Sequence, residues 1–276
     1  MDFSLDSIKD IKLFQPKRGY RFSVDALLLE DFISAKRLNT GIELGAGSGI
    51  ISILLAKRLK TTKIIAVEIQ KFLARCAKKN VVLNELEGRI EILNEDIKNL
   101  KEHFPANKFD FVFSNPPFRK TKSGRLSVDE ERAVARHEIK ITLNDIITAA
   151  SYLLKNTGRF YLIYHPFRLI ELIGLLHKAQ LEPKRMRFVH SRRVESPTRT
   201  GEEAKMVLIE AVKGSGAWLK IEPPFYIYKP RTPHSDAKDN ENNPPFPPLL
   251  KGDEGGLLDN KSSEYTAEMK KVYGIT

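Results

Sequence analysis

The sequence has little cysteine or tryptophan, with one residue of each in 276, and it has no long apolar run. The single cysteine, Cys76, cannot form an intramolecular disulfide, and it excludes a zinc site made of several cysteines. No stretch reaches the ~18 consecutive apolar residues of a membrane-spanning helix. The first ten residues carry three acidic side chains and no apolar core, unlike a secretory signal. These absences predict a cytoplasmic protein with neither a membrane anchor nor a metal site.

The charge of the chain is strongly basic and unevenly distributed. Lys and Arg number 46 against 35 Asp and Glu, which gives a net charge of +11. From Lys229 onward seven basic and eight acidic residues nearly cancel, so the whole excess lies in the first 228 residues. A basic folded body favours a polyanionic partner, and nucleic acid is the first candidate.

Strand-like apolar runs alternate with helical patterns through the middle of the chain. The expected strands cover residues 42–44, 63–69, 90–93, 109–113 and 159–164, and the expected helices cover 50–59, 72–83, 143–154 and 167–178. This alternation predicts an α/β fold with a parallel, doubly wound sheet. Two last strands, 185–190 and 205–212, have no helix between them, so we expect them to pair as an antiparallel terminal hairpin.

The pattern divides the chain into three parts. Residues 39–229 form the expected α/β domain, and residues 1–38 form a basic lead-in that is a lid or an N-terminal addition to the sheet. Ser23 in this lead-in is positioned to cap a helix. Residues 230–276 are rich in Pro, Gly, Asn and Asp, which predicts a disordered, low-complexity tail with a short helix near 267–272.

A glycine-rich turn follows the first strand of the expected domain. Gly45, Gly47 and Gly49 lie where that strand passes into a helix. Glycines at such a turn permit tight backbone angles and let a ligand approach the main chain. The helix that follows offers free N–H groups to an anion or a carboxylate. A dinucleotide fingerprint would need glycine at position 50, so Ile50 disfavours a nicotinamide-dependent reductase.

Acidic residues lie at the ends of the neighbouring strands. Glu43 precedes the glycine turn, and Glu68, near the end of the second strand, suits the hydroxyl groups of a ribose. Asp96, after the third strand, suits an adenine amino group. The order of these features predicts a nucleotide-containing cofactor. The predicted cofactor-binding residues are Glu43, Gly45, Ala46, Gly47, Gly49, Glu68, Ile69, Asp96, Ile97 and Asn115.

A second motif, Asn115-Pro116-Pro117-Phe118, ends the fourth strand. Its prolines stiffen the backbone, and they can aim the Asn115 amide oxygen and the Pro116 carbonyl at one point. Two such acceptors would hold an amino group by both hydrogens, and Phe118 offers a face for stacking. The same tetrapeptide recurs at residues 243–246 without a preceding strand, so we interpret that copy as a decoy.

Together these motifs resemble the class I S-adenosylmethionine-dependent methyltransferases that act on amino nitrogens. The lead-in segment 19–29, GYRFSVDALLL, is similar to the bacterial tRNA1(Val) adenine-N6 methyltransferase family, and the resemblance covers roughly residues 8–229. It implies a Rossmann-like, seven-stranded sheet, S-adenosylmethionine as the cofactor, and tRNA modified beside the anticodon. It also implies that the glycine turn meets the methionine and ribose parts, and that residues 115–118 clamp the acceptor amine. Phe118 departs from the tyrosine of many relatives.

Basic residues near these motifs are candidates for phosphate contacts. They are Arg18, Arg21, Arg119, Lys120, Lys122, Arg192 and Arg193. Residues 120–136 follow the clamp and are expected to form a mobile substrate loop. Other acceptors stay open, namely a protein glutamine (N5) and a ribosomal RNA guanine (N2), and so does a non-catalytic RNA-binding module with a relict cofactor site. The basic charge and the short lead-in favour RNA over protein.

Overall fold

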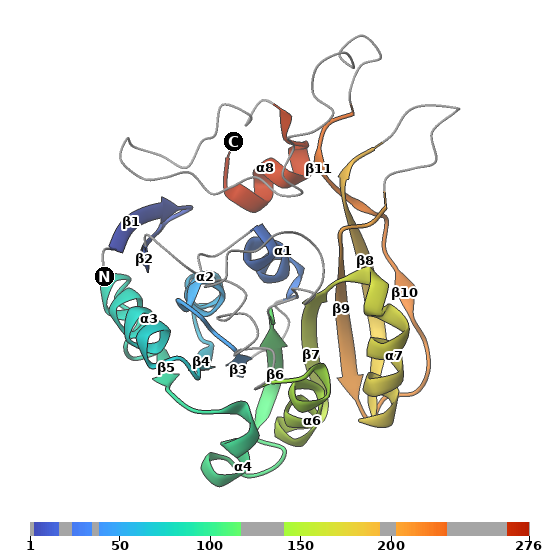
Figure 1. Cartoon of the computed structure of the whole chain (residues 1–276), viewed down its shortest axis with the longest axis horizontal. Coiled ribbons are helices and arrows are strands. Elements are labelled where there is room, and N and C mark those ends of the chain that lie inside the picture. The colour runs from blue at the N-terminus through green and yellow to red at the C-terminus, as the bar shows by residue number, and fades with distance from the viewer. Residues whose placement is uncertain are drawn as a thin grey trace, which may run out of the picture.

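The computed structural model describes residues 3–16, 24–34, 39–116, 141–193, 203–230 and 264–275 of the chain. A twisted sheet runs through the middle of the molecule with helices packed on both of its faces (Figure 1). No helix among these residues is long and apolar enough to cross a membrane. Several expectations lie outside the described ranges, namely the loop at 120–136, the cap at Ser23 and the second tetrapeptide at 243–246.

The central sheet contains nine strands. They are β3 (Thr40–Leu44), β4 (Lys63–Val67), β5 (Ile90–Leu93), β6 (Phe109–Ser114), β7 (Leu154–Tyr164), β8 (Leu181–Arg192), β9 (Met206–Lys213), β10 (Lys220–Ile221) and β11 (Phe225–Tyr228). Their order is β10-β8-β9-β7-β6-β3-β4-β5, and β11 also pairs with β8. Strands β3 to β7 run parallel to one another, whereas β9 is antiparallel to both β7 and β8.

The helices form two layers, one on each face of the sheet. They are α2 (Ile50–Arg58), α3 (Lys71–Leu83), α4 (Leu100–His103), α6 (Leu143–Leu153) and α7 (Leu169–Lys178), with 3-10 turns η1 (Ile97–Asn99) and η2 (Pro166–Arg168). Alternate residues of β7 show the division between the layers. Tyr161 and Ile163 pack with α2 and α3, whereas Phe160 and Leu162 pack with α6 and α7. Side chains alternate along a strand, so β7 contributes to both faces of the sheet, and a layer of helices buries each face.

The predicted doubly wound sheet and its antiparallel hairpin are confirmed. Seven strands, from β3 to β9, correspond to the seven-stranded sheet expected of a class I methyltransferase. The structure adds β10 and β11, which pair parallel with β8 at the edge of the sheet. Sequence reasoning missed β10 because it has only two residues, both exposed, so no alternation of apolar side chains marks it.

The lead-in folds into two pieces that pack on the domain. β1 (Phe3–Ile8) and β2 (Ile11–Pro16) pair as an antiparallel hairpin that is separate from the central sheet. α1 (Val24–Phe32) is buried, with Leu27 and Leu29 fully inaccessible in the same core as α2 and α3. The hairpin is therefore not an addition to the central sheet, and its strand β2 packs against α3 instead.

The last described segment, residues 264–275, corrects part of the expectation of a disordered tail. It contains α8 (Ala267–Tyr273), close to the short helix expected at 267–272. Met269 and Val272 are buried in the core beside α1, and Tyr265 stacks between Tyr228 and Tyr273. Aromatic and apolar residues in this segment provide enough buried surface for order. Residues 231–263 lie outside the described ranges.

Candidate active site

The glycine turn joins β3 to α2 at the carboxyl edge of the sheet. Gly45, Gly47 and Gly49 have φ angles of 80°, 57° and 83°, values that disfavour residues with a side chain. At Gly49 a Cβ atom would lie 3.3 Å from the Cβ of Ala77 on α3. The N–H groups of Gly45 and Ala46 donate to the Val67 carbonyl at 3.0 and 2.8 Å, which fixes the turn against β4.

Glu68 follows β4 and lies directly against this turn. Its Oε2 accepts the Gly47 N–H at 2.8 Å, and its Oε1 accepts the Gln70 N–H at 2.8 Å. Burial raises the pKa of this carboxyl, and the backbone donors oppose that shift. Each carboxylate oxygen can accept more than one hydrogen bond, so both can still receive hydroxyl donors. The structure thus brings together the two cofactor features that the sequence predicted, while the contact with a ribose stays a prediction.

Glu43 is buried within the domain, with 1% of its surface exposed. Its Oε2 accepts the hydroxyl and the backbone N–H of Ser52, the latter at 3.2 Å, on the first turn of α2. Burial raises its pKa to about 8, and the nearby Glu68 acts in the same direction. Glu43 therefore braces the start of α2, and a direct contact with the cofactor stays a prediction.

The segment after β5 is fixed to the same edge. Asp96 caps η1 by accepting the Lys98 N–H at 3.0 Å, and Ile97 is buried beneath it. Asn94 donates to the carbonyls of Glu68 and Ile69, at 2.7 and 3.1 Å. Sequence reasoning did not single out Asn94 as a residue that positions Glu68. Asn94 directly follows the third expected strand, and a polar side chain at such a position often bonds to the neighbouring turn. This position is the sequence signal that could have identified it.

Asn115 and Pro116 leave the carboxyl end of β6 beside the glycine turn. Phe113 pairs with Glu43, and the Ser114 hydroxyl donates to the Leu44 carbonyl at 2.7 Å. Asn115 is half-buried and Pro116 is buried. The acceptor motif and the cofactor features thus lie on neighbouring strands. Pro117 and Phe118 lie outside the described residues, so the stacking face stays a prediction.

Asn80 of α3 is a residue of this site that sequence reasoning missed. It is fully buried, and its Nδ2 donates to the carbonyls of Ser48 in the glycine turn and Phe14 in β2, both at 3.0 Å. Its Oδ1 accepts the Phe14 N–H at 2.7 Å. One side chain therefore joins the N-terminal hairpin to the glycine turn. An asparagine on the otherwise apolar stripe of α3, four residues before Asn84, is the signal that marks it.

Comparison with known proteins identifies this arrangement. Residues 23–179 match the family described as methyltransferase small domain. The chain belongs to this family. The tRNA1(Val) (adenine(37)-N6)-methyltransferase of Porphyromonas gingivalis ATCC 33277 is 34% identical over 61% of this chain and 64% of that protein, just under two thirds of its length. The protein of that name from strain W83 is also 34% identical, over 76% of this chain and 81% of its own.

A solved structure confirms the class of fold. A predicted O-methyltransferase from Agrobacterium tumefaciens superposes with a TM-score of 0.59 at 24% identity, covering 74% of this chain and 88% of that one. S-adenosylmethionine is the cofactor of this methyltransferase, and the described residues fit it. Apart from Gly45 and its two neighbours in the chain, no atom of the described residues lies within 4 Å of where a Cβ of Gly45 would stand, so the turn has open space beside it. The adjacent Glu68 carboxylate provides acceptors for a ribose.

The basic residues predicted to contact phosphate differ in their surroundings. Arg192 was a predicted phosphate contact, but it forms an ion pair with Glu264, donates to the Lys229 carbonyl at 3.0 Å and lies 4.7 Å from the Tyr228 ring centroid. The last segment thus already engages this guanidinium, and a contact of Arg192 with a phosphate stays a prediction. Arg193 is exposed at the end of β8. The other predicted contacts, Arg18, Arg21, Arg119, Lys120 and Lys122, lie outside the described residues.

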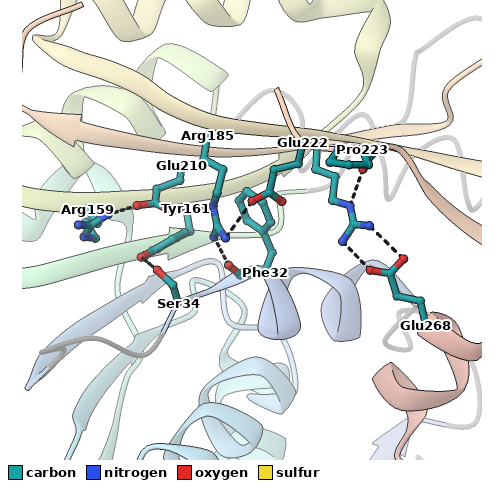
Figure 2. A network of polar contacts seen from close by, with 10 residues as sticks. Phe32, Ser34, Arg159, Tyr161, Arg185, Glu210, Glu222, Pro223 and Glu268 are labelled. Carbon is teal, nitrogen blue, oxygen red and sulfur yellow. Dashed lines mark hydrogen bonds and ion pairs between the residues drawn. The ribbon is translucent and has the colours of Figure 1, made fainter. Parts of the chain in front are cut away.

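A second set of arginines binds acidic side chains of the methyltransferase (Figure 2). Glu210 of β9 is buried between Arg159 and Arg185, and Arg185 also stacks 3.9 Å from the Phe32 ring of α1. Arg187 pairs with Glu268 of α8 at 2.8 Å. These contacts join the sheet to α1 and α8. Among the residues that the structure describes, no cluster of His, Cys, Asp or Glu is arranged to hold a metal ion.

Proposed function

We propose that this methyltransferase transfers the methyl group of S-adenosylmethionine to the exocyclic N6 amino group of an adenine in tRNA, beside the anticodon, in the cytoplasm. The observation that carries the proposal is the position of Asn115 and Pro116, held next to the glycine turn by the bond from Ser114 to Leu44. The names of the Porphyromonas gingivalis relatives support adenine as the acceptor and tRNA as the substrate.

The residues of the chain contribute by binding and orienting. When bound, S-adenosylmethionine supplies an electrophilic methyl group on a sulfonium. Glu68 would accept hydrogen bonds from the ribose hydroxyls, while the glycine turn lets that part of the cofactor approach the main chain. The Asn115 amide oxygen and the Pro116 carbonyl would accept the two hydrogens of the amine. These contacts orient its lone pair and stabilise the positive charge that develops on nitrogen.

RNA is favoured over protein as the acceptor. The net charge of +11 suits a polyanionic substrate, and an unpaired loop nucleotide can turn its base into the site at low cost. A glutamine side chain and the N2 amino group of guanine carry the same pair of hydrogens. They therefore stay the alternatives that an experiment must separate.

The test uses methyl-labelled S-adenosylmethionine, the purified protein and an extract of cells that lack this activity. RNA is then separated from protein and digested to nucleosides. We expect label in N6-methyladenosine from tRNA. Label in protein or in N2-methylguanosine would replace the proposed acceptor, and no transfer with intact cofactor binding would favour the non-catalytic alternative.

Replacing Asn115 by alanine tests the role of the acceptor motif. Asn115→Ala removes one of two convergent acceptors, so kcat should fall by about 100-fold or more. Asn39→Ala is the control, because Asn39 is an exposed asparagine that precedes β3 at the opposite edge of the sheet. Near-wild-type turnover of Asn115→Ala in a folded protein would contradict the proposed role.

A further inference from the structure

Two exposed apolar side chains lie just beyond the end of β7. Phe167 in η2 is 54% exposed and Ile170 in α7 is 92% exposed. The packing of α7 does not require Ile170 to be apolar, because the helix meets the core through Leu172 and Leu176, which are fully buried. An apolar pair at the surface that does not serve the core suggests a binding surface.

The pair lies at the same edge of the sheet as the acceptor motif. β6 and β7 are parallel neighbours, and Ser114 pairs with Leu162. Asn115 therefore leaves β6 beside the last residues of β7, and Phe167 follows the end of that strand by three residues. An RNA that places one nucleotide at Asn115 must lay its neighbours across this edge.

The local contacts favour the face of a base over a phosphate group. His165 lies with its ring 5.3 Å from that of Phe167 at a tilt of 30°, and its Nδ1 lies 3.0 Å from the Lys205 carbonyl. The adjacent Arg168 is paired with both oxygens of Glu171, at 2.7 and 2.6 Å, so its charge is already matched. The aromatic ring of Phe167 and the aliphatic side chain of Ile170 suit the face of an unpaired base.

We infer that Phe167 and Ile170 form a surface on which an unpaired nucleotide next to the acceptor adenine stacks. The inference rests on the proposed function, and it adds the part of the RNA that the enzyme contacts outside the acceptor motif. It explains why exposed apolar side chains occur at this edge. A duplex would hide its base faces, so the surface selects a single-stranded loop.

The chain offers a direct probe, because its only tryptophan, Trp218, lies elsewhere. Trp218 is 72% exposed and follows β9, which runs antiparallel, so it stands at the opposite edge of the sheet. The double variant Trp218→Phe with Phe167→Trp moves the only tryptophan to the inferred surface. Adding an anticodon stem-loop should quench the fluorescence of this tryptophan. The RNA concentration that gives half of the quenching should match the one that gives half of the maximal methylation rate. The wild type, with Trp218 intact, should show no matching quenching.

Kinetics provide the second arm. Phe167→Ala and Ile170→Ala should each raise KM for the stem-loop by about 10-fold, with kcat within about 2-fold and unchanged binding of S-adenosylhomocysteine. Trp218→Ala, the matched exposed aromatic, should leave all three values as in the wild type.

The outcomes separate this inference from the proposed function. If the wild type methylates no RNA, the proposed function fails. If RNA is methylated but the tryptophan at position 167 is not quenched and KM is unchanged, only the inference is wrong. Quenching that depends on protein concentration without RNA would identify a second copy of the chain as the occupant and would also overturn it.

Discussion

At the scale of single residues, the site is built from carboxylates that are buried against backbone donors. Glu68 accepts the N–H groups of Gly47 and Gln70, and Glu43 accepts the backbone N–H and the hydroxyl of Ser52. Burial raises the pKa of both groups. The two acids that sequence reasoning assigned to one cofactor site thus make different contacts within the protein, since Glu68 lies against the glycine turn and Glu43 braces the start of α2.

Glu43 makes the stability of the protein depend on pH. Its pKa rises from an ordinary value of 4.5 to about 8 in the folded chain. The folded state therefore binds more protons than the unfolded state between these values, and the free energy of unfolding falls as pH rises, by up to about 1.4 kcal/mol per pH unit. Glu43→Gln should be more stable than the wild type at pH 8 and should flatten this slope in urea titrations.

The control for this prediction is Glu91→Gln, because Glu91 is an exposed residue of β5. We expect its slope to match that of the wild type. A Glu43→Gln variant whose unfolding free energy falls with pH as steeply as the wild type would show that Glu43 is ionised in the folded chain.

At the scale of elements, long periodic segments were predictable and distant polar contacts were not. The apolar runs of β3 to β7 and the apolar stripe of α7 extend over several residues, so their periodicity identifies these elements from the sequence. Asn115 and Glu68 were predictable at one edge of the sheet, because the carboxyl ends of parallel strands share an edge. Asn80 was not, because its bonds reach Phe14 across 66 residues and leave no local pattern.

The hairpin and the glycine turn should be coupled through Asn80. Asn80→Ala leaves the Phe14 N–H and the Ser48 carbonyl without their partner, so the turn should loosen and S-adenosylhomocysteine should bind about 10-fold more weakly in calorimetry. Asn84→Ala is the control, because Asn84 bonds to Lys12 of the same hairpin but not to the glycine turn. Its affinity should stay within about 2-fold of the wild type.

Hydrogen exchange separates the two effects of these variants. Both should speed exchange of the β2 amides, since each loses an anchor of the hairpin. Equal losses of affinity in the two variants would mean that the hairpin as a whole, and not the Asn80 bond to Ser48, supports cofactor binding.

At the scale of the whole molecule, the two ends of the described chain close over one core. α8 packs beside α1 and β11 (Figure 1). Glu264 and Glu268 form ion pairs with Arg192 and Arg187. The composition of the tail predicted disorder apart from a short helix near 267–272, because the few apolar residues of this segment are diluted by the polar stretch before it. These apolar residues become buried only because α1 and β11, which lie earlier in the chain, form the surface on which α8 packs.

This packing predicts a stabilising role for the last segment. Met269 is fully buried, so Met269→Ala should lower the free energy of unfolding by about 2–4 kcal/mol, measured by urea denaturation. The exposed Lys271 on the same helix provides the control, and Lys271→Ala should change stability by less than about 0.5 kcal/mol. Equal stability of Met269→Ala and the wild type would mean that α8 docks too weakly to matter.

The side chains of Asn80 and Asn84 also affect how one copy of the protein meets another. Asn80 engages both the N–H and the carbonyl of Phe14, and Asn84 does the same for Lys12. Two helical amides thus occupy the outer edge of β2 as a third strand would. An exposed strand edge is a template for pairing with another chain, and this one is already satisfied. The N-terminal hairpin can therefore stand apart from the central sheet without inviting aggregation along β2.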